Sequence, residues 1–299
     1  QQVDYTSKEE CCIEGTEVLT PNGWKDFRDI NVGDDVCQYN VDETIEFTKV
    51  LHKVENDFVG NMIKFSRTGH TCIVTPDHEM VYFNTNKKFT RRKAKDMKIH
   101  NQTHIPVGGI INNVGTDELT FEDRLRIAIQ ADGTNSYWIN TAGEKLLRGV
   151  DGGATHSFGL TKNRKKKRLK WILENLNIQY EESLPDDENE VKFKIHYKHD
   201  NDYKYFRWLD LKDKSSKWCK QFIEECIEWD GYKESSYGGY SSTIKENIDK
   251  VQTIAILAGY YTNIYKGHES ERKDTYHDCY KLSIKINNLI PKSHAVIME

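Results

Sequence analysis

Two apolar segments end in the same Asp-Gly pair, and this repetition constrains the fold more than any other feature of the chain. The segments are RLRIAIQADGT, ending around Asp132, and FIEECIEWDGYK, ending around Asp230. Both have helical spacing of apolar residues, and glycine suits the left-handed position that ends a helix. A carboxylate is disfavoured there by the helix dipole. Two such aspartates in a repeated unit therefore predict a shared function.

A small residue precedes each aspartate by one helical turn: Ala128 before Asp132 and Cys226 before Asp230. Small side chains let two helices approach closely, so we expect these helices to pack together with both carboxylates at adjacent ends. Two carboxylates at such a short distance would repel each other unless a cation lay between them. Hard oxygen ligands suit Mg²⁺ or Mn²⁺. The pattern predicts Asp132 and Asp230 as catalytic metal ligands for phosphodiester hydrolysis.

The same order of elements follows each Asp-Gly pair. Strand material comes first, then a second helix, then another strand, which predicts a duplicated unit over 113–299 with halves of about 113–200 and 201–299. Alternating basic residues in the strand of the first half are candidates for DNA contact, because strand readers alternate. The basic run at the start of the second helix is a further candidate, because its side chains could contact DNA phosphates. These candidates are Lys192, Lys194, His196 and Lys198 on the strand, and Lys162 and Arg164 in the run.

Residues 12–112 have a different pattern. Short apolar stretches are separated by turn signals such as PNG and VGDD, and no helical period is present, so an all-β domain is expected. The first residues lack the features of a signal peptide, and no apolar run is long enough to span a membrane. Seven cysteines without a CxxC pair argue against a disulfide framework or zinc site, which favours a reducing, cytoplasmic location.

The duplicated region resembles the double-motif LAGLIDADG homing endonucleases. Neither copy spells the motif, but both keep its Asp-Gly end and apolar register. The resemblance implies an α+β fold of two pseudo-symmetric αββαββα halves. It also implies a monomeric enzyme that cuts double-stranded DNA over about two helical turns, roughly 20 base pairs. A basic catalytic residue near the metals is implied as well; Lys204 is the candidate, and Lys281 is its counterpart on the last strand.

The amino-terminal region resembles the opening of an intein, the Hint fold that splices proteins. CIEGTEVLTPNGWKDFRDINVGDDV makes Cys12 the first intein residue and 1–11 flanking sequence. A cysteine thiol there can attack the preceding carbonyl to form a thioester. Thr75 and His78 in TCIVTPDHEMVY match the TxxH motif of inteins, whose histidine protonates the leaving nitrogen.

The carboxyl end departs from the intein pattern. Inteins end in a His-Asn pair, whereas KINNLIPKSHAVIME contains none. We therefore expect an incomplete splicing domain, explained by a truncation, by decay or by a separate C-terminal intein fragment that acts as partner. Its unpaired strand edges should leave it partly disordered or pair with a substitute partner.

Three functions remain open from the sequence. The first is a metal-dependent homing endonuclease beside an incomplete splicing domain. The second is a splicing module whose inactive endonuclease only binds DNA. The third is a transcriptional regulator or RNA maturase on the same fold, which would bind nucleic acid without metal. A Hedgehog-like autoprocessing protein is disfavoured, since it would not need the duplicated Asp-Gly unit.

Overall fold

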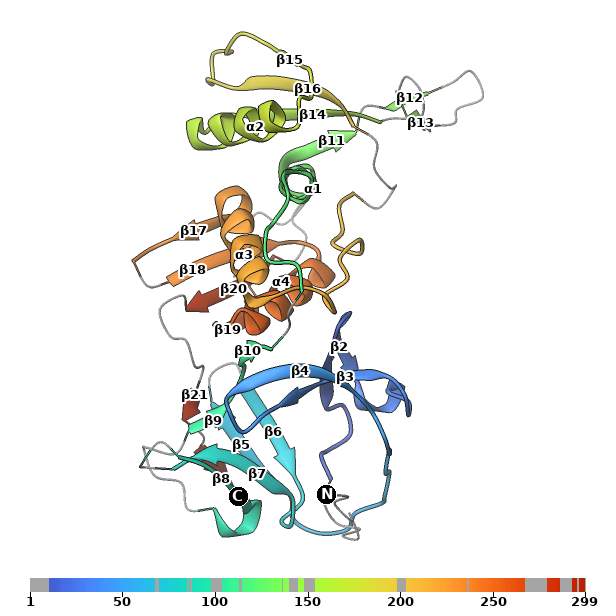
Figure 1. Ribbon diagram of the computed structural model, residues 1–299, viewed down its shortest axis with the longest axis vertical. Helices are drawn as coiled ribbons and strands as arrows, with labels where there is room; N and C mark the ends of the chain where they lie inside the picture. Colours follow the sequence, from blue (N-terminus) through green and yellow to red (C-terminus); the bar gives the residue numbers. More distant parts are fainter. Residues whose placement is uncertain are drawn as a thin grey trace, which may run out of the picture.

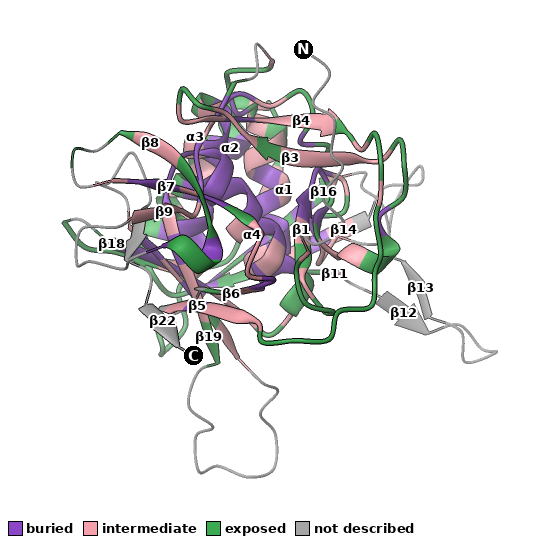
Figure 2. Cartoon of the chain, turned by 90° about the horizontal axis from the view of Figure 1, so that it is seen from below, coloured by how far each residue is buried: buried purple, intermediate pink, exposed green. Residues whose placement is uncertain are grey.

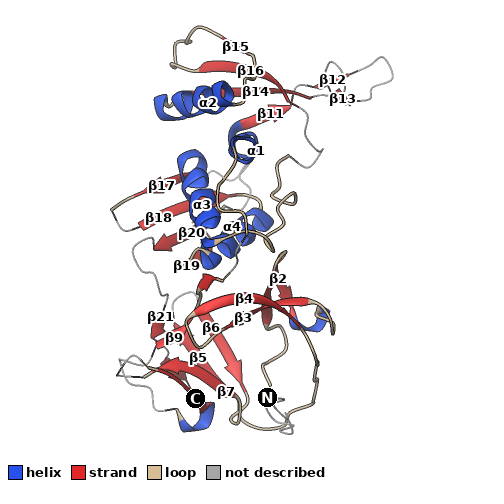
Figure 3. Cartoon of the chain, in the orientation of Figure 1, coloured by secondary structure: helices blue, strands red, loops and turns tan. Residues whose placement is uncertain are grey.

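The structure is a computed structural model with a mixed α+β architecture. Helices gather in the upper and middle parts of the molecule, and the lower part is built of strands and short 3-10 turns (Figure 1, Figure 3). The residues that the structure describes are 11–67, 70–84, 86, 88–97, 104–112, 115–135, 137–139, 145–147, 154–197, 203–235, 237–266, 279–285, 292–294 and 296–298. No helix among them is long and apolar enough to cross a membrane.

The amino-terminal region consists of short strands, as its turn-rich sequence predicts. A small apolar cluster that includes Phe65, Val74, Met80 and Tyr82 fills its centre. Its elements are β1 (Glu17–Thr20), β2 (Gly23–Asp26), η1 (Phe27–Asp29), β3 (Asp35–Tyr39), β4 (Thr44–Lys49), β5 (Ile63–Arg67), β6 (His70–Val74), β7 (Glu79–Phe83), β8 (Phe89–Lys93), η2 (Ala94–Asp96), β9 (His104–Pro106) and β10 (Ile110–Ile111).

Two strands from the carboxyl end return to this region. β21 (Lys292–His294) pairs antiparallel with β9, and β22 (Val296–Met298) pairs antiparallel with β5. The expected division assigned all of 201–299 to the second endonuclease half, so the structure differs from it at the carboxyl end. Of the two outcomes expected for the open strand edges, the structure shows the substitute partner, because β21 pairs with β9 and β22 pairs with β5.

The rest of the chain contains one arrangement twice. Each half forms a four-stranded sheet of the same order, β11-β14-β16-β15 in the first and β17-β18-β20-β19 in the second. The first half comprises α1 (Phe121–Asp132), β11 (Gly133–Asn135), β12 (Tyr137–Ile139), β13 (Lys145–Leu147), β14 (Ala154–Leu160), α2 (Asn163–Asn175), β15 (Tyr180–Glu182) and β16 (Val191–Tyr197). The second comprises α3 (Ser216–Asp230), β17 (Gly231–Lys233), β18 (Tyr237–Ser242), α4 (Lys245–Leu257), β19 (Tyr261–Lys266) and β20 (Tyr280–Lys285). Within the described residues, neither half shows the closing helix of an αββαββα unit.

The ends of α1 and α3 are set by local interactions. Thr120 and Asp123 form a capping box at the start of α1, and the Ser215 side chain accepts from the Trp218 N–H at the start of α3. Gly133 and Gly231 follow the last turns, but their φ angles are −75° and −128°. The prediction of left-handed glycines was therefore wrong. Glycine is needed for space: a Cβ at Gly133 would lie 2.8 Å from the Ile129 Cα, and one at Gly231 would lie 2.3 Å from the Gly239 carbonyl oxygen.

One apolar core runs through both halves. Figure 2 shows the buried helices gathered at its centre, with mostly half-buried strands and exposed loops around them. Ala128 and Cys226 are both buried there, and α1 packs against α3 as the small residues predict. The amino-terminal region shares this core, which includes its buried residues Leu19, Ile45 and Ile111. Polar contacts add to the junction: Trp24 Nε1 donates to Gln252 Oε1 on α4, and the Lys212 ammonium pairs with Asp35 on β3.

Candidate active site

Asp132 and Asp230 close the adjacent helices α1 and α3, and one lysine lies between them. The Lys165 Nζ atom is 2.6 Å from Asp132 Oδ2 and 3.6 Å from Asp230 Oδ1. Lys165 comes from the first turn of α2 and is 9% exposed. The structure therefore brings the two predicted aspartates within reach of a single cation.

Lys204 contacts the backbone of α1's last turns. Its Nζ donates to the Gln130 carbonyl oxygen (3.0 Å) and, more weakly, to that of Ile129 (3.5 Å). These carbonyls belong to the helix end, where a cation is favourable. Burial lowers the pKa of Lys204, while the nearby charges of Asp230 and Asp132 act in the opposite direction. Lys204 is thus close enough to both carboxylates for their charges to act on its ammonium.

The environment of Asp230 disfavours an isolated negative charge. Burial raises the pKa of Asp230, and the Asp132 carboxylate raises it further; Lys165 and Lys204 partly offset these effects. A raised carboxyl pKa means that ionised Asp230 is costly at neutral pH without nearby positive charge. Lys165 supplies that charge in this structure.

The donor set fits a divalent cation. Two carboxylates from different helices already share one ammonium, and carboxylate oxygens are the ligands that Mg²⁺ and Mn²⁺ prefer. No cluster of three or more histidine, cysteine or acidic side chains occurs among the described residues, so a cation here would take its remaining ligands from backbone, water or substrate.

The sequence alone pointed to Lys162 and Arg164, but did not single out Lys165 within the same basic run. The signal was present: Lys165 stands one turn before Leu169, on the stripe with Ile172 and Leu173 that α2 buries. A lysine on the buried stripe of an otherwise charged helix needs an anionic partner, because lysine is almost never fully buried unpaired.

The predicted strand readers lie on one exposed face. Lys192, Lys194 and His196 alternate along β16 with buried Val191, Phe193 and Ile195. The buried residues face the core with α2, so the three basic ones face away from the helices. Lys198 lies outside the described residues.

Lys281 is placed differently from the prediction. It is exposed on β20, where it alternates with buried Leu282 and Ile284 and shares a face with Ser283 and Lys285. β20 occupies the same place in its sheet as β16 does in the first half. No described hydrogen bond or ion pair links Lys281 to the aspartates, so its position matches the strand readers rather than the site at the helix ends.

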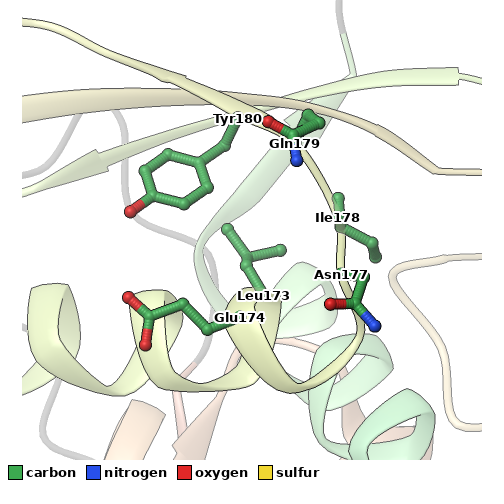
Figure 4. A pocket seen from close by; sticks show the side chains of 6 residues that line it. All are labelled: Leu173, Glu174, Asn177, Ile178, Gln179 and Tyr180. Atoms are coloured by element: carbon green, nitrogen blue, oxygen red, sulfur yellow. The ribbon is translucent and has the colours of Figure 1, made fainter.

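Lys162 immediately precedes α2 and Arg164 lies in its first turn; α2 covers the opposite side of the first sheet. Lys162 is exposed at the helix start, and Arg164 is bound to α3 through the backbone carbonyl and the carboxylate of Glu228. These residues therefore do not share a face with Lys192, Lys194 and His196. The hollow of about 450 Å³ at the other end of α2, lined by residues 173–174 and 177–180, contains none of the predicted site residues (Figure 4).

The predicted splicing residues meet at the end of β6. Thr75, which is 1% exposed, contacts Cys11 three times. The Thr75 N–H donates to the Cys11 carbonyl oxygen (3.0 Å), and Thr75 Oγ1 accepts from the Cys11 N–H (3.0 Å) and donates to the Cys11 carbonyl oxygen (3.4 Å). The peptide carbonyl just before Cys12 is therefore held by two donors from Thr75.

Cys12 and His78 flank this contact. Cys12 forms an antiparallel bridge with Val74. The pKa of its thiol is raised, first by partial desolvation and then by the neighbouring Cys11. The His78 N–H closes the turn by donating to the Thr75 carbonyl, and its Nδ1 atom is buried. Asp77 stands between Thr75 and His78 in the sequence and pairs with both Lys93 and Lys95. These ion pairs lower the pKa of the Asp77 carboxyl to about 2. These ion pairs fix the turn that carries Thr75 and His78.

The chain matches no protein-family model. It is 28% identical to the ribonucleoside-diphosphate reductase subunit beta of Aquifex aeolicus (strain VF5), over 92% of this chain and 44% of that protein. The chain thus spans less than half the length of this curated relative.

Among solved structures, similarity is weak. The homing endonuclease I-DmoI, in complex with DNA and Ca, has a TM-score of 0.37 and 13% identity, over 56% of this chain and 83% of its own. The AceL NrdHF class 3 split intein, in a GSH-linked splice-inactive variant, has a TM-score of 0.28 and 14% identity, over 63% of this chain and 99% of its own.

Proposed function

We propose that the chain is a site-specific DNA endonuclease of the LAGLIDADG type, with Asp132 and Asp230 as its metal-binding carboxylates. The observation that carries the proposal is their convergence: the last residues of two repeated helices meet at one buried ammonium. Carboxylates that serve only as helix ends have no reason to share a cation across two repeats. The proposal includes Mg²⁺ or Mn²⁺ as cofactor and double-stranded DNA as substrate.

Each residue of the site has a distinct task in phosphodiester hydrolysis. A divalent cation held by Asp132 and Asp230 would supply Lewis-acid stabilisation of charge on the phosphate. Lys204, fixed by the Gln130 carbonyl, holds a positive charge beside the same carboxylates. Burial lowers the pKa of this lysine, which makes its proton easier to transfer to a water or a leaving oxygen.

The two exposed sheet faces supply a surface for the DNA. Lys192, Lys194 and His196 on β16 correspond in position to Lys281, Ser283 and Lys285 on β20. Basic and polar side chains that alternate on strands can reach base edges in a major groove. We therefore propose that Lys281 contacts DNA and does not take part in catalysis.

Metal removal tests the proposed activity. Plasmids with randomised inserts of roughly 20 base pairs, about two helical turns, present many candidate target sequences at once. We expect linearised products in Mg²⁺ and none after chelation with EDTA, because the carboxylates alone cannot neutralise the phosphate. Sequencing of the cut ends identifies the target, and equal cutting in EDTA would contradict the proposal.

A second function is favoured by the contacts of Thr75. In an intein, attack of the Cys12 thiolate on the Cys11 carbonyl forms a thioester and releases the Cys12 amine, which takes up a proton. The two Thr75 donors on the Cys11 carbonyl oxygen are placed where negative charge develops in that step. We propose that the amino-terminal region performs this acyl shift, with His78 as proton donor, and that completion of splicing requires a C-terminal intein fragment.

Thr75→Ala tests this second function. With dithiothreitol or hydroxylamine as nucleophile, we expect the wild-type chain to be cleaved between Cys11 and Cys12. Loss of the hydroxyl donor should slow cleavage by about a hundredfold, the lower end of the range for one oxyanion donor, because the Thr75 N–H remains. Mass spectrometry of the released peptide gives the rate. Cys12→Ala is the inactive control, and wild-type cleavage in Thr75→Ala would exclude the hydroxyl from the step.

Reductase activity is not part of the proposal. The curated relative bears the name of a reductase subunit, but this chain matches less than half of it. The gene of such a subunit is instead a candidate target: an uninterrupted coding sequence is the first defined substrate to test beside the randomised plasmids.

A further inference from the structure

The position between the two carboxylates is already taken by a side chain of the protein. Lys165 Nζ lies 2.6 Å from Asp132 and 3.6 Å from Asp230, in the place where a shared divalent cation would bind. We propose that Lys165 is a built-in competitor of the metal: the ammonium closes the site in the free protein, and the divalent cation loads only when Lys165 moves aside. This inference rests on the proposed function of the two aspartates.

The charges around the site support competition. From α1 and α3 come the carboxylates of Asp132 and Asp230, from α2 comes Lys165, and from the segment after β16 comes Lys204. Two ammonium groups therefore face two carboxylates, and the cluster is already neutral without metal. A divalent cation that entered beside Lys165 would be repelled by it at contact distance. Displacement of Lys165 removes this repulsion and frees the carboxylate oxygens.

The Lys165 ammonium can move because, among the residues that the structure describes, it is held in place only by its contacts with the two carboxylates and the Trp229 ring. Its stem lies on the buried stripe of α2 with Leu169, and its ammonium lies 6.0 Å from the centre of the Trp229 ring. A lysine has a long, flexible stem, and a neighbouring anion can attract the ammonium. A DNA phosphate at the site is such an anion, so substrate binding would draw Lys165 away and admit the metal.

Mn²⁺ binding to the DNA-free protein tests the inference directly. Free Mn²⁺ is measured by its electron paramagnetic resonance signal during titration of the wild type, Lys165→Gln, Lys165→Arg and Lys167→Gln. Lys167→Gln removes the same charge from an exposed position on the same helix. We expect Lys165→Gln to bind Mn²⁺ at least about tenfold more tightly than the wild type, since a like charge at contact distance is gone. Lys165→Arg and Lys167→Gln should bind like the wild type.

A melting experiment gives a second readout. Without metal, Lys165→Gln leaves Asp132 and Asp230 without their nearest counter-charge, so its melting temperature should fall below that of Lys167→Gln. Mn²⁺ should raise the melting temperature of Lys165→Gln more than that of the wild type, because tighter binding stabilises the native state more. Circular dichroism measures both.

The outcomes separate the two proposals. Unchanged or weaker Mn²⁺ binding in Lys165→Gln, with binding lost in Asp132→Asn, would overturn the competition and leave the metal site intact. Wild-type Mn²⁺ binding in Asp132→Asn would overturn the metal site itself. Absence of binding in both the wild type and Lys165→Gln would overturn both.

Discussion

Asp132→Asn and Asp230→Asn are each expected to reduce cleavage of both DNA strands by at least a hundredfold. An amide keeps the size of the carboxylate but loses its charge, so the variants lose a ligand rather than a packing group. Replacement of a residue that only supports a ligand already costs roughly 10- to 100-fold in metal affinity or activity, and loss of the ligand itself should cost more. Gel electrophoresis of nicked and linear plasmid measures each strand.

A DNA-binding measurement and a control variant show whether the loss of cleavage is specific to the two aspartates. Both variants should bind target DNA as the wild type does, because the strand face of Lys192 and Lys194 is unchanged. Asp187→Asn removes one exposed carboxylate from the turn before β16, outside the helices that carry the two aspartates, and should cut normally. Loss of activity in only one of the two site variants would show that the aspartates do not form one shared centre.

Glu225→Gln is expected to lower the free energy of unfolding by about 3 kcal/mol, the lower end of the range for breaking a buried ion pair. The Glu225 carboxylate is fully buried, and it accepts hydrogen bonds from Arg124 on α1, Arg168 on α2 and Trp229 on its own helix. The amide leaves two guanidinium groups without their anion. We take the lower end because the arginine side chains are 15% and 28% exposed.

Chemical unfolding followed by helical circular dichroism measures the loss. Glu224→Gln is the matched control: its side chain is exposed on the same helix, and surface changes of this kind cost within about 0.5 kcal/mol. If the two variants were equally stable, the Glu225 cluster would not hold α1, α2 and α3 together.

The sequence predicted the site where its signal is local and repeated. Ala128 and Cys226 stand one turn before each aspartate, and this spacing alone predicted the packing of α1 on α3. The alternation of Lys192 and Lys194 with apolar residues likewise predicted one exposed strand face. Both patterns repeat within a few residues, so neighbouring residues carry enough information to define them.

Features that depend on distant contacts could not be predicted in this way. β21 and β22 pair with strands that lie far earlier in the chain, and nothing in their short sequences names those partners. The glycines were predicted correctly as helix ends but for the wrong reason. A Cβ at either one would collide with the helix backbone four residues earlier, at Ile129 or Ile227, and a Cβ at Gly231 would also collide with Gly239 on β18. The sequence does not single out Lys165 because it lies within a run of basic residues, although it shares the buried stripe of α2.

Anomalous diffraction from crystals soaked in Mn²⁺ tests the central claim most directly. The account predicts a manganese peak between the carboxylates of Asp132 and Asp230, with the Lys165 ammonium displaced from its position 2.6 Å from Asp132. A peak bound elsewhere, or no peak while Lys165 still joins the two carboxylates at saturating Mn²⁺, would contradict it.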